Sequence, residues 1–158
     1  MPNLDEVLDA LLAEEEEIQF VEFSNATGIA IGRRLLSIAE EEGLPIAIDV
    51  TRHGQQLFHA SLPGATLDND VWIHRKNRVV NHFFHSSFYM GMRYKSQGST
   101  IEEKSLLPER KYAPHGGAFP ILVRNVGVIG IVTVSGLPQE DDHKLVVRVL
   151  RDFITNRE

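Results

Sequence analysis

The spacing of apolar residues in the N-terminal part of the chain predicts two helices. Leucine and valine recur at intervals of three and four over residues 4–12, which is the period of one helix face. A second helix is expected over residues 24–42, because Ser24 is a typical N-cap residue and Gly43, followed closely by a proline, ends it. Residues 18–23 form a short strand or a linker between the two helices.

Alternating apolar and polar residues predict two β-hairpins. In the first, residues 45–51 and 55–62 are joined by a turn at Arg52-His53-Gly54, where glycine suits a positive φ. In the second, residues 118–123 and 128–135 flank a turn at residues 124–127. Each strand presents one apolar face, so we expect helices to pack against that side of the sheet.

The remaining segments are predicted to be helical or polar. A long helix is expected from about Asp68 or Asp70 to Tyr94, and the polar stretch 96–114 holds a short helix near residues 101–106. The last helix follows Glu140-Asp141-Asp142, acids that a helix N-terminus favours. The order helix, helix, hairpin, helix, hairpin, helix predicts one α+β domain over residues 1–158, with an antiparallel sheet packed against helices.

Composition and charge exclude several classes of protein. The chain has 158 residues, of which 42% are hydrophobic and 24% charged, typical of a globular domain. Its 16 basic and 22 acidic residues give a net charge of −6, unfavourable for nucleic acid and for anionic membrane surfaces. No cysteine is present, which excludes disulfides and thiolate chemistry. Without a long apolar run or a leader-like N-terminus, a cytoplasmic protein without a membrane span is expected.

A lysine on an apolar helix face is the most unusual feature of the pattern. Projection at 100° per residue places Lys76 and Ser87 on the same face as Trp72 and Phe83. Burying an unpaired ammonium is costly, so two interpretations stay open. Lys76 either points into a pocket and meets an anion, or it extends to the edge of the face or pairs with Asp49 or another acid.

Other cations and glycines suggest an anion site. Three cations fall within one helical turn: Arg75, Lys76 and Arg78. They are either solvated surface charges or side chains clustered in a cleft, where they would bind a phosphate, carboxylate or propionate group. His115 precedes Gly116 and Gly117, whose backbone N–H groups would bind an anion if this segment is not simply a tight turn. The sequence contains no dinucleotide-binding, P-loop or nucleophile-elbow motif.

Two histidines and an acidic run suggest metal or partner binding. His82 and His85 lie three residues apart on the predicted helix and could supply two ligands to one metal ion, although a third ligand is needed. Haem iron requires only one axial histidine. The run Glu14 to Glu17 is a solvated helix face, a cation site or a contact for basic partners.

The C-terminal half resembles a known family. Gly116-Gly117-Ala118-Phe119-Pro120-Ile121, Gly127-Val128-Ile129-Gly130 and Val134-Ser135-Gly136-Leu137-Pro138, followed by acids and His143, are similar to the GlcG/HbpS-like family. Trp72-Ile73-His74-Arg75-Lys76 with Phe83, Ser86 and Ser87 resembles its short subfamily with a haem-degrading domain. The resemblance implies a profilin-like α+β fold and a homo-oligomer. Some relatives bind haem or iron, and others accompany corrinoid or glycolate metabolism.

These observations predict an oligomeric, cytoplasmic ligand-binding protein. Its ligand is expected to be a small anion, haem or a related tetrapyrrole, held by Arg75, Lys76, Ser87, His115, Gly116 and Gly117, with a metal ion as a further possible cofactor. A small enzyme that acts on a small acid through Lys76, His85 or His115 is the first alternative. The second is an oligomeric scaffold. The large apolar side chains of residues 83–92 favour a subunit interface or a helix buried on both sides, and residues 1–17 are a candidate oligomerisation extension.

Overall fold

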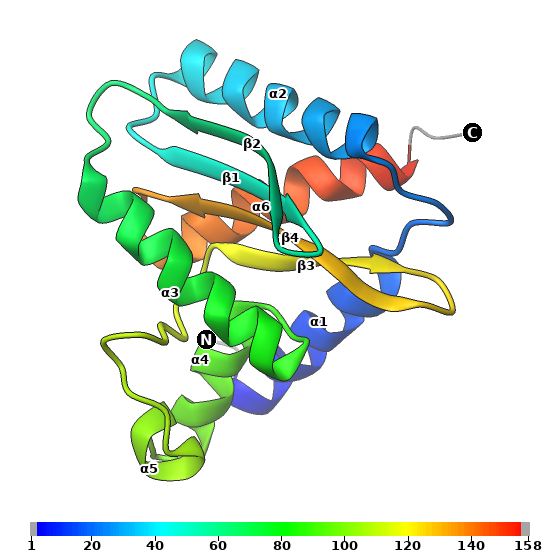
Figure 1. Ribbon diagram of the computed structural model, residues 1–158. Helices are drawn as coiled ribbons and strands as arrows, with labels where there is room; N and C mark the ends of the chain where they lie inside the picture. The colour runs from blue at the N-terminus through cyan, green and yellow to red at the C-terminus, as the bar shows by residue number, and fades with distance from the viewer. Residues whose placement is uncertain (1–2, 156–158) are drawn as a thin grey trace.

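Six helices and four strands follow one another in residues 3–155, which the computed structural model describes. The helices are α1 (Leu4–Glu17), α2 (Asn25–Glu42), α3 (Leu67–Phe83), α4 (Ser87–Ser96), α5 (Ile101–Ser105) and α6 (Gln139–Thr155). The strands are β1 (Ala47–Arg52), β2 (Gln55–Ser61), β3 (Ala118–Val123) and β4 (Gly127–Ser135). The strands form one sheet in the order β2-β1-β4-β3, and every neighbouring pair is antiparallel (Figure 1). The predicted α+β class is confirmed.

The two faces of the sheet differ in chemistry. Ile48 and Val50 of β1 are fully buried in the main apolar core, to which α2 and α6 contribute their apolar faces. The alternate residue Asp49 points to the opposite face, where it meets Asn77 of α3. Helix α3 therefore crosses a partly polar side of the sheet, while α2 and α6 cover the apolar side (Figure 1).

Helix α2 lies against β2 because it has a glycine at the point of closest approach. A Cβ atom at Gly32 would overlap the ring of Phe58 on β2. The close contact at this glycine is therefore with a side chain of the neighbouring strand. The C-terminus of α2 agrees with the prediction, since Gly43 adopts the left-handed conformation at φ +67°.

The single long helix that was predicted to reach Tyr94 is wrong, because two helices occupy that stretch. Helix α3 ends at Phe83, and Phe84 adopts a left-handed φ of +62°. The Ser86 side chain then accepts the Tyr89 backbone N–H and so caps the start of α4. The break leaves Phe84 62% exposed.

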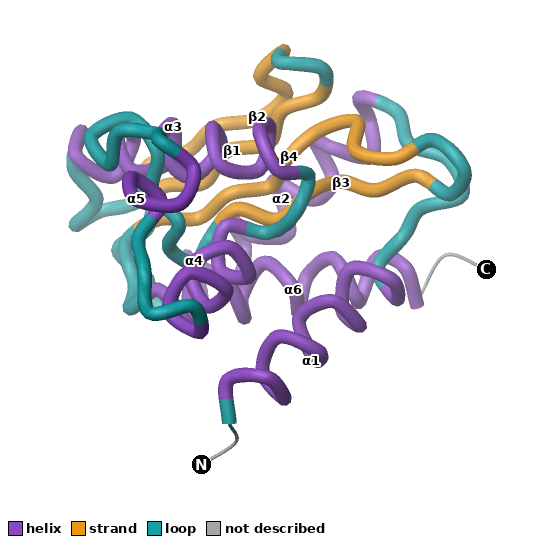
Figure 2. Tube along the Cα trace, turned by 90° about the horizontal axis from the view of Figure 1, so that it is seen from below, coloured by secondary structure: helices purple, strands orange, loops and turns teal. Residues whose placement is uncertain are grey.

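Helix α1 packs along α4 of its own chain (Figure 2) and is linked to α6 by ion pairs of Glu14 and Glu17. Leu11 joins the apolar cluster that contains Tyr89 and Met90. Three of the four glutamates of residues 14–17 bind a basic side chain: Glu14 binds His143, Glu15 binds His85 and Glu17 binds Arg151. The acidic run is therefore mostly a set of contacts within the domain rather than a solvated face. Within residues 3–155, the helices are too short or too polar to cross a bilayer.

Candidate functional site

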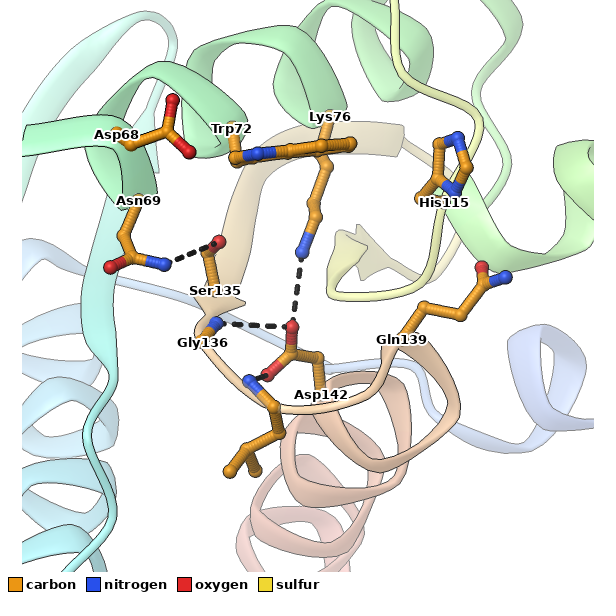
Figure 3. A pocket seen from close by; sticks show the side chains of 10 residues that line it. Asp68, Asn69, Trp72, Lys76, His115, Ser135, Gly136, Gln139 and Asp142 are labelled. Carbon is orange, nitrogen blue, oxygen red and sulfur yellow. Dashed lines mark hydrogen bonds and ion pairs between the residues drawn. The ribbon is translucent and has the colours of Figure 1, made fainter. Parts of the chain in front are cut away.

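A cavity of about 310 Å³ lies where α3 passes the end of β4 and the start of α6. Its wall is assembled from three separate parts of the chain, including Asn69, Trp72, Lys76, His115, Gln139 and Asp142 (Figure 3). The volume is near the lower end of the range for small-molecule sites. Two of the predicted site residues, Lys76 and His115, line this cavity.

Lys76 is held at the cavity by two oxygen atoms. Only 3% of the residue is exposed, and its Nζ donates to the Val134 carbonyl at 3.0 Å and to Asp142 Oδ2 at 3.2 Å. Of the two interpretations left open by the sequence, the internal ion pair is confirmed, and the acid is Asp142 rather than Asp49. The same ammonium also lines the cavity, so the pair and the pocket coexist.

Asp142 is fixed by the turn that precedes α6. Its Oδ1 accepts the Leu137 backbone N–H at 3.0 Å, and its Oδ2 accepts the Gly136 N–H at 3.3 Å. Burial raises the pKa of Asp142 against the opposing effect of the Lys76 charge. Burial likewise lowers the pKa of Lys76, against the attraction of Asp142. Each residue thus favours the charged form of its partner, in a site where burial disfavours both charges.

The glycine at position 117 makes room for the ammonium. Gly117 has a φ of +138°, and a Cβ there would lie 2.6 Å from Lys76 Nζ and would also meet the Val134 carbonyl. Gly116 has a different role, because its N–H donates to Gln139 Oε1 at 2.9 Å. An anion that binds the Gly116 N–H, as the sequence predicted, would have to displace Gln139 from it. Neither Gly116 nor Gly117 lines the cavity.

His115 stands at the mouth of the cavity beside the only tryptophan of the chain. The rings of Trp72 and His115 meet edge to face with centroids 5.4 Å apart. The Arg75 guanidinium carbon lies 4.4 Å from the Trp72 ring centroid, and its nitrogens donate to the Glu109 carbonyl. Partial burial, assisted by the Lys76 and Arg75 charges, lowers the pKa of His115. The imidazole is therefore neutral near pH 7 and offers a proton-accepting nitrogen.

Arg75 and Ser87 are not among the residues that line the cavity. Ser87 is fully buried, and its Oγ accepts the Ala118 N–H at 3.1 Å. This bond fixes the start of β3. Sequence reasoning missed Asn69, Gln139 and the role of Asp142, which was interpreted as an acid favoured by the helix N-terminus. The turn at Gly136-Leu137-Pro138 directly before it was the available signal, since such a turn exposes backbone N–H groups.

The two histidines predicted to share a metal ion lie on either side of a helix end. His85 Nδ1 bonds to Glu15 Oε1 at 2.7 Å, while the His82 ring contacts Phe83 and Tyr112. The helical spacing on which a shared ion was predicted does not exist. Across residues 3–155, no group of three or more metal-binding side chains has a suitable arrangement.

The family of the protein follows from comparison of its sequence with known families. The family described as haem degrading protein HbpS-like matches residues 23–151. The chain belongs to the HbpS-like family. This confirms the resemblance that the sequence motifs indicated.

Curated relatives and solved structures agree with this assignment. The HbpS-like chain is 50% identical to a UPF0303 protein of Streptomyces coelicolor over 141 residues, which are 89% of each chain. It matches the crystal structure of the Ybr137w protein with a TM-score of 0.86 and 35% identity, covering 94% of this chain and 87% of the other. A PduOC:haem complex matches with a TM-score of 0.64 at 17% identity, covering 83% and 93%, and supports the fold alone.

Proposed function

We propose that this HbpS-like protein binds a small molecule through a carbonyl or carboxylate oxygen in the cavity beside α3. The observation that carries the proposal is the buried ammonium of Lys76. It has three N–H donors, and two of them are directed to Val134 and Asp142. A ligand oxygen at the cavity would accept the third and complete the hydrogen bonds of a group that is expensive to leave unsatisfied.

The charges around the cavity limit the ligand class. The lining holds one ammonium, Lys76, and two carboxylates, Asp68 and Asp142, and His115 is neutral near pH 7. These groups leave the lining net negative, so each negative charge on a ligand is unfavourable and a dianion such as phosphate is the least suited. A monocarboxylate or a neutral carbonyl compound suits it better, with the Trp72 ring as an apolar wall.

An enzyme acting on the same ligand is the alternative that the site also supports. Lys76, His115 and Asp142 line one cavity, and a lysine, a histidine and an acid in one pocket are typical of enzymes that use acid–base catalysis. His115, with its lowered pKa, would serve as the general base, and Lys76 would stabilise negative charge on the ligand oxygen. Chemical turnover of a bound probe distinguishes this enzyme from a binding protein.

Fluorescence of Trp72 tests the proposal directly, because it is the only tryptophan and lies in the cavity wall. Acetate, pyruvate and acetamide are titrated, with inorganic phosphate as the dianion. The double variant Lys76→Met/Asp142→Asn removes the ion pair without leaving an unpaired charge, and the exposed Lys144→Met is the matched control. A saturable change with a monocarboxylate or carbonyl probe that is lost only in the double variant supports the site. Equal binding to the double variant refutes it.

Haem binding is a second candidate, which a different cavity favours. A groove of about 520 Å³ between α4 and α5 is lined by His85, Tyr89, Arg93 and Lys104. Glu15, which is 7% exposed, holds His85 Nδ1 in place and leaves Nε2 as a potential iron ligand. Arg93 and Lys104 make no ion pair within residues 3–155 and would bind propionate groups.

Absorbance spectra with added haemin test this second candidate. A Soret shift is expected for the wild type and for His82→Ala, and its loss is expected for His85→Ala. Since His82 lies three residues away and outside the groove lining, the pair of variants isolates the role of His85. A shift that survives in His85→Ala contradicts the assignment.

We further propose that the chain forms a homo-oligomer through the surface next to this groove. Phe84 and Leu106, which are 62% and 85% exposed, adjoin its lining residues in sequence. Large exposed apolar side chains are typical of interaction surfaces. Native mass spectrometry is expected to show a discrete oligomer that Phe84→Ser/Leu106→Ser dissociates, and a monomeric wild type contradicts the proposal.

A further inference from the structure

A second cavity lies on the other side of α3, against the β1–β2 hairpin. It has a volume of about 270 Å³, and its lining includes Asp49, Gln56, His59, Asp70, Ile73 and His74. It shares no lining residue with the cavity at Lys76. The first half of α3 therefore separates two distinct hollows over the polar face of the sheet.

The carboxylate of Asp49 is buried without a cation. The residue is 2% exposed, its Oδ1 accepts Gln56 Nε2 at 2.6 Å and its Oδ2 accepts Asn77 Nδ2 at 3.4 Å. Both donors are neutral amides, and in residues 3–155 no lysine, arginine or histidine nitrogen lies within 4.0 Å of this carboxylate. A buried carboxylate normally has a positive partner, as Asp142 has in Lys76.

The other titratable groups of the cavity do not supply that positive charge. His59 is the register partner of Asp49 on β2, but its Nε2 is bound to Asp70 Oδ1 at 2.8 Å. The lining thus contains two carboxylates and two imidazoles, and no lysine or arginine among the described residues. A positive ligand would be stabilised there by the low-dielectric surroundings of Asp49.

We propose that this cavity binds a small organic cation, a protonated primary amine on a short aliphatic stem, with its ammonium on Asp49. An ionised carboxylate accepts about four hydrogen bonds, and amides occupy two of these positions on Asp49. Ile73 gives the stem an apolar contact. The volume of about 270 Å³ exceeds many times the roughly 30 Å³ share of one water molecule.

A substitution that preserves shape separates this role from a structural one. Asp49→Asn removes the charge and retains the size of the side chain. The exposed Gln56 amide is able to rotate and present its oxygen to the new NH₂ group. If Asp49 is retained for a ligand, the free variant has a melting temperature at or above that of the wild type, because the buried charge has been removed.

Calorimetric titration with propylammonium tests the proposal, and 1-propanol and MgCl₂ replace it in parallel arms. Binding to the wild type and to Asp68→Asn, an acid on the other cavity, is expected, with at least a tenfold loss in Asp49→Asn. The variant Lys76→Met/Asp142→Asn should bind the amine normally, so failure here is distinguishable from failure of the proposed function. Equal affinity for 1-propanol, binding of Mg²⁺ instead of the amine, or unchanged amine binding by Asp49→Asn overturns the proposal. A wild type that does not bind the amine, together with a lowered melting temperature of Asp49→Asn, assigns Asp49 a structural role.

Discussion

Breaking the buried pair of Lys76 and Asp142 is expected to destabilise the protein strongly, and removing both charges is not. Lys76→Met retains most of the aliphatic stem but strands a carboxylate that is 2% exposed. Asp142→Asn strands an ammonium that is 3% exposed and leaves it with neutral oxygen partners only, such as the Val134 carbonyl. The double variant leaves no charge to strand.

The magnitude follows from the burial of both partners. Removing one member of a buried ion pair costs about 3–5 kcal/mol, whereas replacing both is often close to neutral. Asp142 also keeps two backbone N–H donors after Lys76→Met, which places that variant toward the lower end of the range. For a domain of this length, each kcal/mol corresponds to roughly 2–4 °C in melting temperature. Each single variant should therefore melt about 6–20 °C below the wild type.

Urea unfolding at pH 7 measures the three variants and the wild type as a double-mutant cycle. The expected coupling free energy exceeds about 2 kcal/mol, with unchanged m-values. Lys144→Met, which breaks the exposed pair with Glu140, is the control and should change stability by less than about 1 kcal/mol. Additive single effects, each below about 1 kcal/mol, would mean that solvent screens the pair and would refute the reasoning.

Three further predictions concern the surroundings of this pair and the contacts of α1. Gly117→Ala should lower the free energy of unfolding by about 3 kcal/mol or more, because the backbone is strained and the new Cβ overlaps Lys76. The control Gly98→Ala, at φ +61° with open space around it, should lower it by about 1 kcal/mol in the same denaturant unfolding experiment. The pKa of His115 lies below its ordinary 6.5 in the folded protein, so the unfolded chain takes up this proton first and the free energy of unfolding falls as pH drops below 6.5. His115→Gln should flatten that slope in unfolding curves recorded between pH 7.5 and 5, and an unchanged slope would exclude His115 as its source. Glu15→Gln weakens charge-assisted bonds to His85 and the Ser86 N–H, so it should lower the free energy of unfolding by about 1.5–3 kcal/mol. The exposed Glu17→Gln should lower it by less than about 1 kcal/mol.

Local patterns were sufficient to predict most of the fold. The alternation in β1 correctly assigned Ile48 and Val50 to one face and Asp49 to the other, because side chains in a strand alternate with period two. Gly43 was correctly expected to end α2, since a left-handed residue there rarely carries a side chain. Both signals arise within a few residues, where the chemistry of the backbone leaves few choices.

The error in the long helix has a local cause as well. Phe84 occupies a left-handed conformation that phenylalanine seldom adopts, and neither glycine nor proline marks the break. Apolar residues continue at helical spacing on both sides, so the periodicity of α3 runs into that of α4 without interruption. Ser86 was the one available cue, because a serine that precedes an apolar segment is a typical N-cap.

The site itself depended on contacts that no local pattern encodes. Lys76 and Asp142 are 66 positions apart, and the fold brings them together only because α3 and the start of α6 meet at one end of β4. Periodicity identified Lys76 as anomalous but could not identify its partner, for which only Asp49 or another acid could be suggested. Ser87 shared the predicted face with Lys76, and the helix break directed it to the Ala118 backbone instead.

The correction at Lys76 changes the meaning of Asp49. Had Asp49 been the partner of Lys76, its own carboxylate would be balanced, and the cavity beside it would need no positive ligand. With Asp142 in that role, the carboxylate of Asp49 keeps only neutral amide donors beside a cavity. The two hollows then differ in the group that would hold a ligand, since one presents the ammonium of Lys76 and the other a carboxylate without a cation. A ligand that fits one should be rejected by the other, and Asp49→Asn and Lys76→Met/Asp142→Asn should each abolish one binding event while leaving the second intact.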